Sequence, residues 1–240
     1  MKRFTYLTSL ASLLIIALVT GCSCHLHAVK GSGNVTEQVR PVSDFDNIVL
    51  KGCADIYFTQ GDKCELKVIT DDNLMDKIET KIDGRSLIVK TRSMSPSKLE
   101  IHVSMKNIKG FNIKGSGNIS NKAPFTADNL YLNVSGSGDM KLNNITAKGI
   151  KVEINGAGDI SANGKSDRTQ IDISGSGNIN FNDMEADDVK VKISGSGDCS
   201  VFAKSSLKTE IYGSGNISYR GEPKNMKSIN VGTGDIKKIK

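Results

Sequence analysis

Apolar and polar residues alternate along most of the chain with the period of β-strands. Val189, Val191 and Ile193 are separated by lysines before one glycine-rich corner, and Cys199 and Val201 continue the alternation after it. Alternation with period two, rich in β-branched residues, indicates strands with one buried face. The chain is therefore predicted to be all-β.

A four-residue motif, Gly-x-small-Asx, recurs nine times between these runs. The copies begin at Gly31, Gly52, Gly115, Gly136, Gly156, Gly175, Gly195, Gly213 and Gly232. Successive copies lie 18 to 21 residues apart, except for one gap of 63 residues after Gly52. Because 63 is three times 21, we expect the gap to hold turns whose motif has been lost. One period of about 20 residues would then run through the chain.

Two architectures could host these repeats, an antiparallel meander of hairpins or the stacked coils of a parallel β-solenoid. The residue after each Asx is apolar in all nine copies, and an apolar residue stands two places before the first glycine in eight. Hairpins need no constant phase from one copy to the next, whereas stacked coils do. The pattern favours a β-helix-like solenoid of nine or more coils, with Gly-Ser-Gly-Asn/Asp corners stacked on one edge.

The last residue of every motif copy is Asn or Asp. Glycine accepts positive φ freely, and Asn and Asp tolerate the left-handed region better than other residues do. Their side chains can also bond nearby backbone amides. We therefore predict a structural ladder along the corners, formed by Asn34, Asp55, Asn118, Asp139, Asp159, Asn178, Asp198, Asn216 and Asp235.

The corner motif is superficially similar to the calcium rolls of secreted toxins, but those repeat every nine residues. A cation ladder would favour carboxylates throughout. Here acids mostly alternate with amides, which avoids stacking like charges about 5 Å apart. We expect neither a metal nor a cofactor, and leave open whether any single corner binds a cation.

One stretch departs from the strand pattern. Leu74, Met75 and Ile78 follow acidic residues and are spaced as one face of a helix. We predict one short helix near 72–79, followed by a hairpin around Asp83 and Gly84.

The N-terminus carries an export signature. Lys2 and Arg3 precede an uncharged apolar stretch, residues 7–19, which is too short to span a membrane. The stretch ends in Leu-Val-Thr-Gly-Cys, which resembles the lipobox of bacterial lipoproteins, with Cys22 as the lipid-bearing residue. An ordinary secretory signal with a chance cysteine is the alternative. The predicted organisation is a signal peptide (1–21), a lipidated tether (22–30) and a single β-solenoid domain (31–240).

Charge and cysteine content add little. Removal of residues 1–21 takes away Lys2 and Arg3 and lowers the formal charge from +6 to +4. The remaining lysines are dispersed, so we expect no nucleic-acid partner. Cys53, Cys64 and Cys199 are an odd number in the body of the chain, and a Cys53–Cys64 bridge is left open.

The segments 55–62, 66–68, 72–78 and 87–89, together with the later GSGN and GSGD series, resemble the head GIN domain of putative auto-transporter adhesins, common in Bacteroides-like bacteria. The resemblance covers roughly residues 29–236. It implies a right-handed β-helix-like fold, a cell-envelope location and, more weakly, adhesion. Cys53-Ala54 departs from the Ser-Gly of the other corners, and no self-exporting translocator barrel is expected.

Residues suited to catalysis are sparse. His102 stands alone in the body of the chain, where alternation should turn it away from the Ile and Val side, and no serine has an evident base partner. A polysaccharide-active β-helix enzyme would typically use clustered acids, arginines and a sugar-stacking groove. The chain has no Trp and five Tyr. We therefore expect no enzymatic activity.

The sequence leads us to expect a non-enzymatic envelope lipoprotein that serves adhesion or recognition. A structural spacer or scaffold without a dedicated ligand is the alternative. Its partners would be the membrane, through the lipid, and a glycan or an envelope or host protein. The outer membrane is the expected location, with the surface or periplasmic face left open. The possible ligand face comprises Tyr57, Tyr131, Tyr212 and Tyr219.

Overall fold

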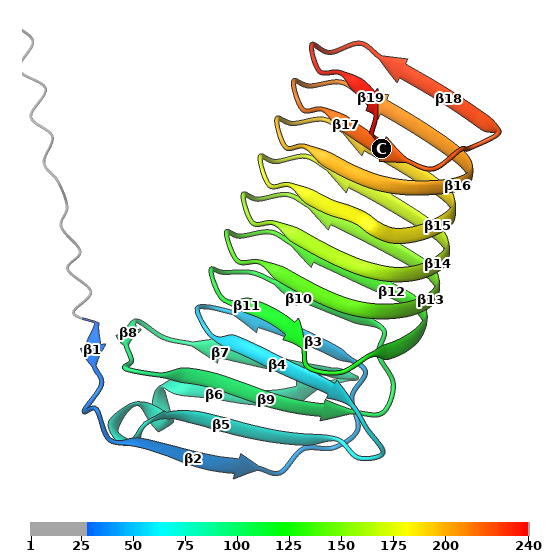
Figure 1. Cartoon of the computed structure of the whole chain (residues 1–240). Coiled ribbons are helices and arrows are strands. Elements are labelled where there is room, and N and C mark those ends of the chain that lie inside the picture. The colour runs from blue at the N-terminus through cyan, green and yellow to red at the C-terminus, as the bar shows by residue number, and fades with distance from the viewer. Residues whose placement is uncertain (1–27, 240) are drawn as a thin grey trace, which may run out of the picture.

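The computed structural model describes residues 28–239, which form a protein with 64% strand and 3% helix. A β-solenoid of about six turns, built from stacked parallel coils, rises from a smaller base near the N-terminal end (Figure 1). The predicted all-β solenoid is confirmed. The expected number of coils, nine or more, is wrong, because about six are formed.

The base is built largely from antiparallel strands. Its elements are β1 (Val29–Lys30), β2 (Val35–Arg40), β5 (Glu65–Asp71), the helix η1 (Asp72–Lys77), β6 (Ile78–Asp83), β7 (Ser86–Thr91), β8 (Met94–Ser95) and β9 (Leu99–Met105). β5 lies between β2 and β9 and is antiparallel to both. β6 and β7 form the predicted hairpin, with Gly84 at φ 59° in its turn. The predicted helix is present as a shorter 3₁₀ helix.

The gap of 63 residues between two motif copies is not a run of degenerate coils. β3 (Asn47–Lys51) and β4 (Asp55–Gln60) flank one corner, and β10 (Gly110–Ile113) and β11 (Asn118–Asn121) flank the next. β10 pairs directly with β3, and β11 with β4, both parallel. On their other side, β3 pairs with β7 and β4 with β9. The intervening chain passes beneath this coil, builds the base and returns. The prediction that this gap holds further coils was wrong because alternation of period two does not distinguish antiparallel from stacked parallel strands.

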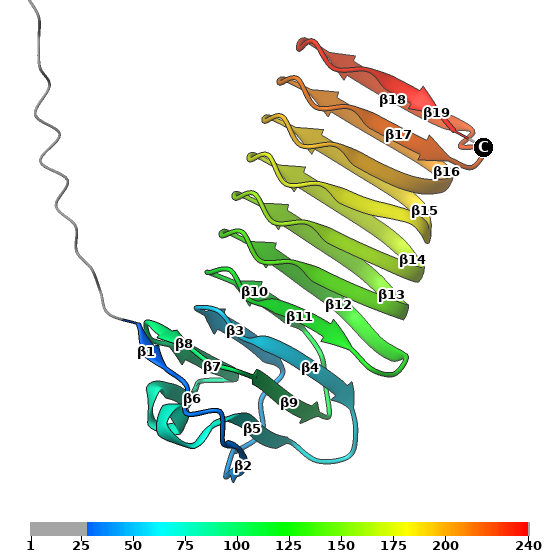
Figure 2. The same ribbon diagram turned by 60° about the vertical axis from the view of Figure 1, so that its left-hand side comes forward.

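Longer strands form the coils above. They are β12 (Phe125–Val134), β13 (Met140–Ile154), β14 (Ile160–Ile173), β15 (Ile179–Ile193) and β16 (Cys199–Ile211), followed by β17 (Ile217–Arg220), β18 (Asn225–Asn230) and β19 (Ile236–Lys238). Consecutive long strands pair in parallel over most of their length (Figure 2).

Each strand from β13 to β16 turns twice and so covers three sides of a coil, whereas β12 covers the second and third sides and β11 the first. The buried residues of β13 are Met140 and Leu142 on a first side, Ile145 and Ala147 on a second, and Ile150, Val152 and Ile154 on a third. The glycine corner then leads to the first side of the next coil. We call the edge that carries the corners the corner edge, and the turn between the second and third sides the groove edge.

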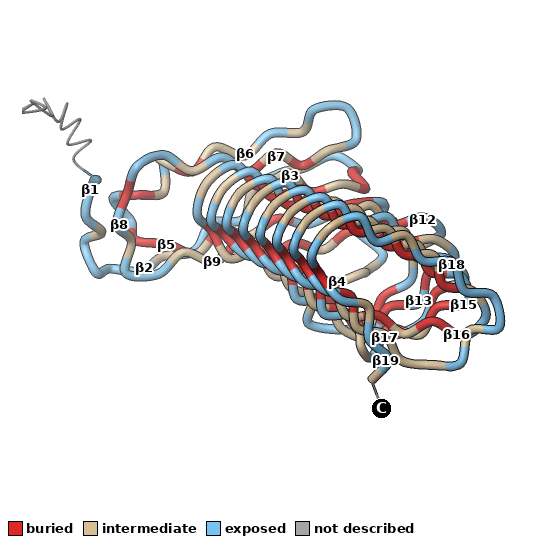
Figure 3. The backbone as a smooth tube through the Cα atoms, turned by 90° about the horizontal axis from the view of Figure 1, so that it is seen from above, coloured by how far each residue is buried: buried red, intermediate tan, exposed pale blue. Residues whose placement is uncertain are grey.

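Buried side chains fill the inside of the coils, and in Figure 3 the buried positions of the backbone form rows along the stack. One row on the third side runs through Leu132, Val152, Ile171 and Val191, which pair in register. Burial of such a row stabilises the stack by about 2 kcal/mol for each aliphatic side chain. The solenoid therefore has a packed interior.

The corner glycines are required by the close approach of neighbouring coils. A Cβ on Gly156 would overlap the carbonyl oxygen of Gly136 in the coil below, and a Cβ on Gly158 would overlap that of Gly138. Among the stacked corners, only Gly52 has a positive φ, and no corner Asx has one. The expected left-handed corner conformation is therefore wrong. Glycine is needed because backbones about 4.8 Å apart leave no room for a side chain that points along the stack.

Candidate ligand-binding surface

Hydrogen bonds join the Asx side chains of the corner edge from coil to coil. Oδ1 of Asn118 accepts the backbone N–H of Asp139 at 3.1 Å, and Oδ1 of Asp139 accepts that of Asp159 at 2.8 Å. The amide of Asn118 also donates to Asp55 at 2.8 Å. The same backbone bond continues, at 2.7 to 2.9 Å, through Asn178, Asp198, Asn216 and Asp235. From Asn118 to Asn216, each Asx thus satisfies a backbone amide that the next corner would leave open.

Asn34 does not join this ladder. Its amide donates to Asp72 at 2.9 Å, and the backbone N–H of Gly33 donates to Asp71 at 2.7 Å. The first motif copy therefore ties the N-terminal segment to the start of η1 rather than to another corner. The hydrogen bonds that Asp71 accepts, from Ser97 and from Gly33, hold the pKa of its carboxyl below the ordinary value. Cys22 lies outside the described residues.

The three cysteines within the described residues lie apart from one another. Cys53 is exposed beside Thr91, Cys64 is half-buried and Cys199 is buried, and all three are free thiols. The Cys53–Cys64 bridge left open by the sequence is not formed. Burial raises the pKa of the Cys199 thiol, which fits its place in the core row of the first side.

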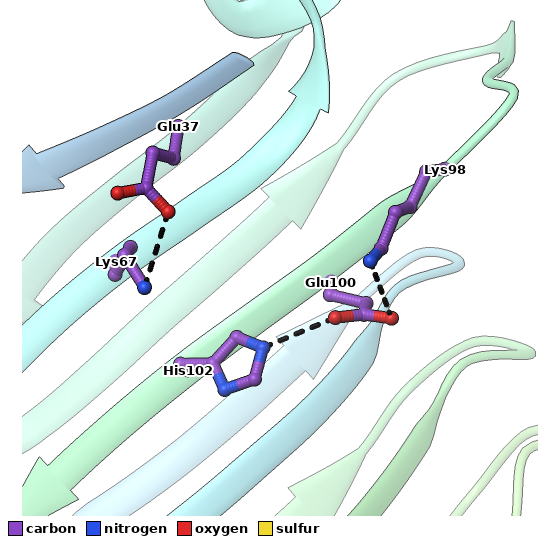
Figure 4. A network of polar contacts seen from close by, with 5 residues as sticks. All are labelled: Glu37, Lys67, Lys98, Glu100 and His102. Carbon is purple, nitrogen blue, oxygen red and sulfur yellow. Dashed lines mark hydrogen bonds and ion pairs between the residues drawn. The ribbon is translucent and has the colours of Figure 1, made fainter. Parts of the chain in front are cut away.

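Ion pairs cover the outer face of the base (Figure 4). Glu100 accepts from Lys98 at 3.2 Å and from His102 at 3.1 Å, and Lys67 pairs with Glu37 at 3.2 Å. The hydrogen bond from His102 contributes most to lowering the pKa of Glu100. His102 faces outward, as the alternation predicts. Pairs as exposed as these contribute little to stability.

The four tyrosines named as a ligand face do not lie together. Tyr57 packs against His102 on the base, with ring centroids 5.3 Å apart, and Lys122 Nζ lies 4.5 Å from its ring centre. The other three are spread over two sides of the solenoid. Tyr131 lies on the third side, Tyr212 follows the end of β16, and Tyr219 packs against the core on the first side.

Two open grooves meet on the groove edge of the lower coils, and we call them the paired grooves. The first, of about 670 Å³, lies between residues 107–109 of the base and the turns of β12 and β13. The second, of about 580 Å³, lies over the third side of β12, β13 and β14. Asn129, Lys148 and Asp167 line both grooves.

The second groove has an apolar floor and an aromatic wall. Leu130 and Ile150, both buried, lie beneath it, and Tyr131 stands beside them. The Tyr131 hydroxyl donates to Glu153 at 2.5 Å. Burial, reinforced by this hydrogen bond, raises the pKa of Tyr131 to about 12. The hydroxyl therefore stays protonated at neutral pH, and its bond to Glu153 fixes the ring at the side of the groove.

Most cations at the paired grooves have carboxylate partners. Lys148 contacts Asp128 at 2.6 Å, and Lys151 contacts Glu153 at 2.7 Å. These hydrogen-bonded pairs raise the pKa of both lysines and lower that of Asp128. Arg168 differs from them. It is exposed, and within residues 28–239 it forms no ion pair.

The turn that carries Arg168 is held by a buried hydroxyl pair. Ser166 Oγ and Thr169 Oγ1 lie 2.8 Å apart, with 7% and 2% of the two residues exposed. In the coil below, Ala147 and Ile150 occupy these positions. Ser166, Thr169, Gly149 and Arg168 are not among the site residues predicted from the sequence. The loss of apolar residues at 166 and 169, where the other coils are apolar, could have marked the hydroxyl pair, but no such signal marks Gly149 or Arg168.

The family described as "Putative auto-transporter adhesin, head GIN domain" matches residues 44–223. No curated protein matches the chain. Within the described residues no helix is long and apolar enough to cross a membrane. In the same part of the chain, no three His, Cys, Asp or Glu side chains are grouped to hold a metal ion.

Solved structures of similar fold come from Bacteroides and Parabacteroides species. A putative adhesin from Bacteroides fragilis is 25% identical, with a TM-score of 0.85 over 88% of this chain and 100% of that one. A putative lipid binding protein from Parabacteroides distasonis is 30% identical, with a TM-score of 0.73 over 89% and 100%. A putative adhesin from Parabacteroides merdae is 25% identical, with a TM-score of 0.72 over 89% and 99%.

Proposed function

The chain belongs to the family of the putative auto-transporter adhesin, head GIN domain, and from this premise we propose that it is a non-enzymatic recognition module of the bacterial cell envelope. The observation that carries the proposal is the paired grooves. They hollow the groove edge of the lower coils and bring together Tyr131, a buried apolar floor and several charged side chains. Concave sites with an apolar floor and a few polar groups are typical of ligand binding.

The proposed anchor is a lipid on Cys22, in a chain exported to the outer membrane. Support comes from the apolar stretch that ends at this cysteine and from the entry of the chain into the fold. β1 pairs with β8 beside the base, at the opposite end from β19 (Figure 1). Lys30 lies eight Cα-to-Cα steps after Cys22, so the tether would span at most about 29 Å. The paired grooves would then lie toward the membrane end of the solenoid.

A spacer without a ligand is the second candidate, and one observation favours it. Charges on the third side pair within their own coil, as in Lys151–Glu153 and Lys208–Glu210, both at 2.7 Å. Such a self-neutralised surface suits a rod that binds nothing. It does not explain why the regular side is hollowed at the lower coils, and for this reason we place recognition first.

Catalysis and lipid binding inside the coils are both less well supported than recognition. No histidine or cysteine lines the paired grooves, so general acid–base work would have to come from Asp128 or Asp167 beside Lys148. The coil interior is filled by packed side chains. A lipid, which the name of the Parabacteroides distasonis relative mentions for that protein, would therefore have to lie on the surface of this chain.

The proposal is tested by probing the soluble domain on an array of neutral and acidic glycans, matrix proteins and phospholipid vesicles. We expect retention of a defined glycan or matrix protein that is lost when Gly149 is changed to Leu. Protease treatment of intact cells, with lysed cells as the control, shows whether the domain is exposed outside. Retention of nothing on the array would contradict recognition and favour the spacer.

A further inference from the structure

We propose that the second groove binds an acidic saccharide, one that carries a carboxylate or sulfate group. In this proposal Gly149 provides the space for a sugar ring and Arg168 binds the anionic group. The inference rests on the proposed function and names its ligand class.

Gly149 differs from the corner glycines in having no structural need to be glycine. Its φ is not positive, and a Cβ there would approach only the exposed side chain of Asn129, at 2.8 Å from Oδ1. A flexible side chain end can move aside, whereas the backbone that faces each corner glycine cannot. Residues in register with Gly149 on other coils are Asn129, Arg168, Asp188 and Ser206, all with side chains. The missing side chain therefore opens the groove above Ile150.

Arg168 is the cation of this groove without a carboxylate of its own. Lys148 and Lys151 are neutralised by Asp128 and Glu153, which lie outside the groove lining. Besides these two paired lysines, the lining holds Arg168, which forms no ion pair within the described part of the chain, and one acid, Asp167. A guanidinium presents donors in a planar fork that matches carboxylate and sulfate oxygens. The charge and its geometry therefore favour an anionic ligand.

The Arg168 turn is fixed before any ligand arrives. The Ser166–Thr169 hydroxyl pair bridges the two residues that flank Asp167 and Arg168 beneath the surface. A charge held on a braced turn loses less conformational freedom on binding than one on a loose loop. Tyr131, held through Glu153, supplies a flat apolar wall on the other side of Gly149. Cation, gap and ring together match a saccharide that has one polar anionic edge and one apolar face.

The test uses the soluble domain and defined probes in calorimetric titrations. The probes are a sulfated hexasaccharide, an oligogalacturonate and a neutral dextran oligosaccharide. The variants are Arg168→Gln, Arg168→Lys and Gly149→Leu, and the matched control is Ser206→Leu, which occupies the same register position three coils away from Gly149. Circular dichroism and thermal unfolding check that each variant is folded.

We expect binding of at least one acidic probe, weaker at high salt, and not of dextran. Arg168→Gln should weaken it about 10- to 100-fold, as expected for loss of one charge-assisted hydrogen-bonded contact. Gly149→Leu should abolish it, Arg168→Lys should restore part of it, and Ser206→Leu should leave it unchanged. If only dextran binds, and Gly149→Leu abolishes this binding, the proposal of an acidic ligand is wrong but the proposed recognition function is supported. If acidic probes bind Arg168→Gln and Gly149→Leu as tightly as the wild type, the proposed site is wrong. If no probe, glycan or matrix protein binds, both the inference and the proposed function fail.

Discussion

The corner edge and the groove edge of the solenoid follow different physical constraints, although the same strands connect them. At the corner edge, a Cβ on Gly158 would meet the backbone of Gly138, and each Asx bonds the next coil. At the groove edge, Gly149 faces only a movable side chain, and the turns differ in charge and polarity from coil to coil. Stacking dictates the residues of the first edge, whereas the second can vary without disturbing the stack. The comparison suggests that the corner edge builds the rod and the groove edge carries its recognition.

The largest expected effect is at the corner edge. Gly158→Ala places a methyl group against the carbonyl of Gly138, so the coils must separate locally and the protein should lose about 3 kcal/mol of unfolding free energy. Gly149→Ala should change it by no more than about 0.5 kcal/mol. Urea unfolding of the two variants measures the difference directly. Equal losses would remove the distinction between the edges.

A second effect tests how the base supports the first groove. Asp46 is 1% exposed and binds Arg85 at 2.7 Å and Lys109, which lines that groove, at 3.1 Å. Burial opposes ionisation of Asp46, but the hydrogen bonds from Arg85 and Lys109 outweigh it and lower its pKa. Asp46→Asn should lose about 2 kcal/mol at neutral pH.

The lowered pKa of Asp46 fixes the pH dependence of that loss. A carboxyl group whose pKa is lower in the folded than in the unfolded protein stabilises the fold when the pH is above its unfolded pKa, about 3.9. This contribution falls away as the pH drops through the folded pKa. The wild type should therefore lose its advantage over Asp46→Asn below about pH 4. Urea midpoints of both proteins between neutral and acidic pH provide the check, and a difference that grows in acid would contradict it.

A smaller effect concerns the braced turn of the groove edge. Ser166→Ala leaves the buried Thr169 hydroxyl without its partner and should lose about 1 to 2 kcal/mol. Adding Thr169→Val restores the apolar pair found in neighbouring coils and should recover most of the loss. A double-mutant cycle in thermal or urea unfolding reveals the coupling. Additive losses would mean that the hydroxyl pair does not act as a unit.

The smallest effect is expected in the exposed ladder. Asp198 accepts the backbone N–H of Asn216 at 2.7 Å and its side-chain amide at 3.0 Å. Asp198→Ala should lose about 1 kcal/mol, because water can replace part of these bonds. Asp198→Asn keeps the acceptor and should lose less. The order of the two variants in urea unfolding tests the structural role of the ladder, and equal values would argue against it.

The solenoid was predictable because its determinants recur in phase. Eight of the nine motif copies lie in the stacked corners, and the apolar residue that follows each Asx keeps them in phase. The base could not be predicted, because residues such as Leu66 and Val68 alternate in the same way whether their strands run parallel or antiparallel. The sequence also could not show why the corners require glycine, because a positive φ and a close approach of two backbones select the same residue. The groove edge depends on single residues, Gly149 and Arg168, that no repeat marks.

The most direct test of this account is the behaviour of Gly149→Leu on the glycan array at a temperature where its circular dichroism matches that of the wild type. We predict that Gly149→Leu is fully folded but no longer retained by the glycan that holds the wild type, while Ser206→Leu is retained. A Gly149→Leu protein that unfolds, or one that binds as the wild type does, would contradict the claim that the groove edge serves recognition and the corner edge serves the fold.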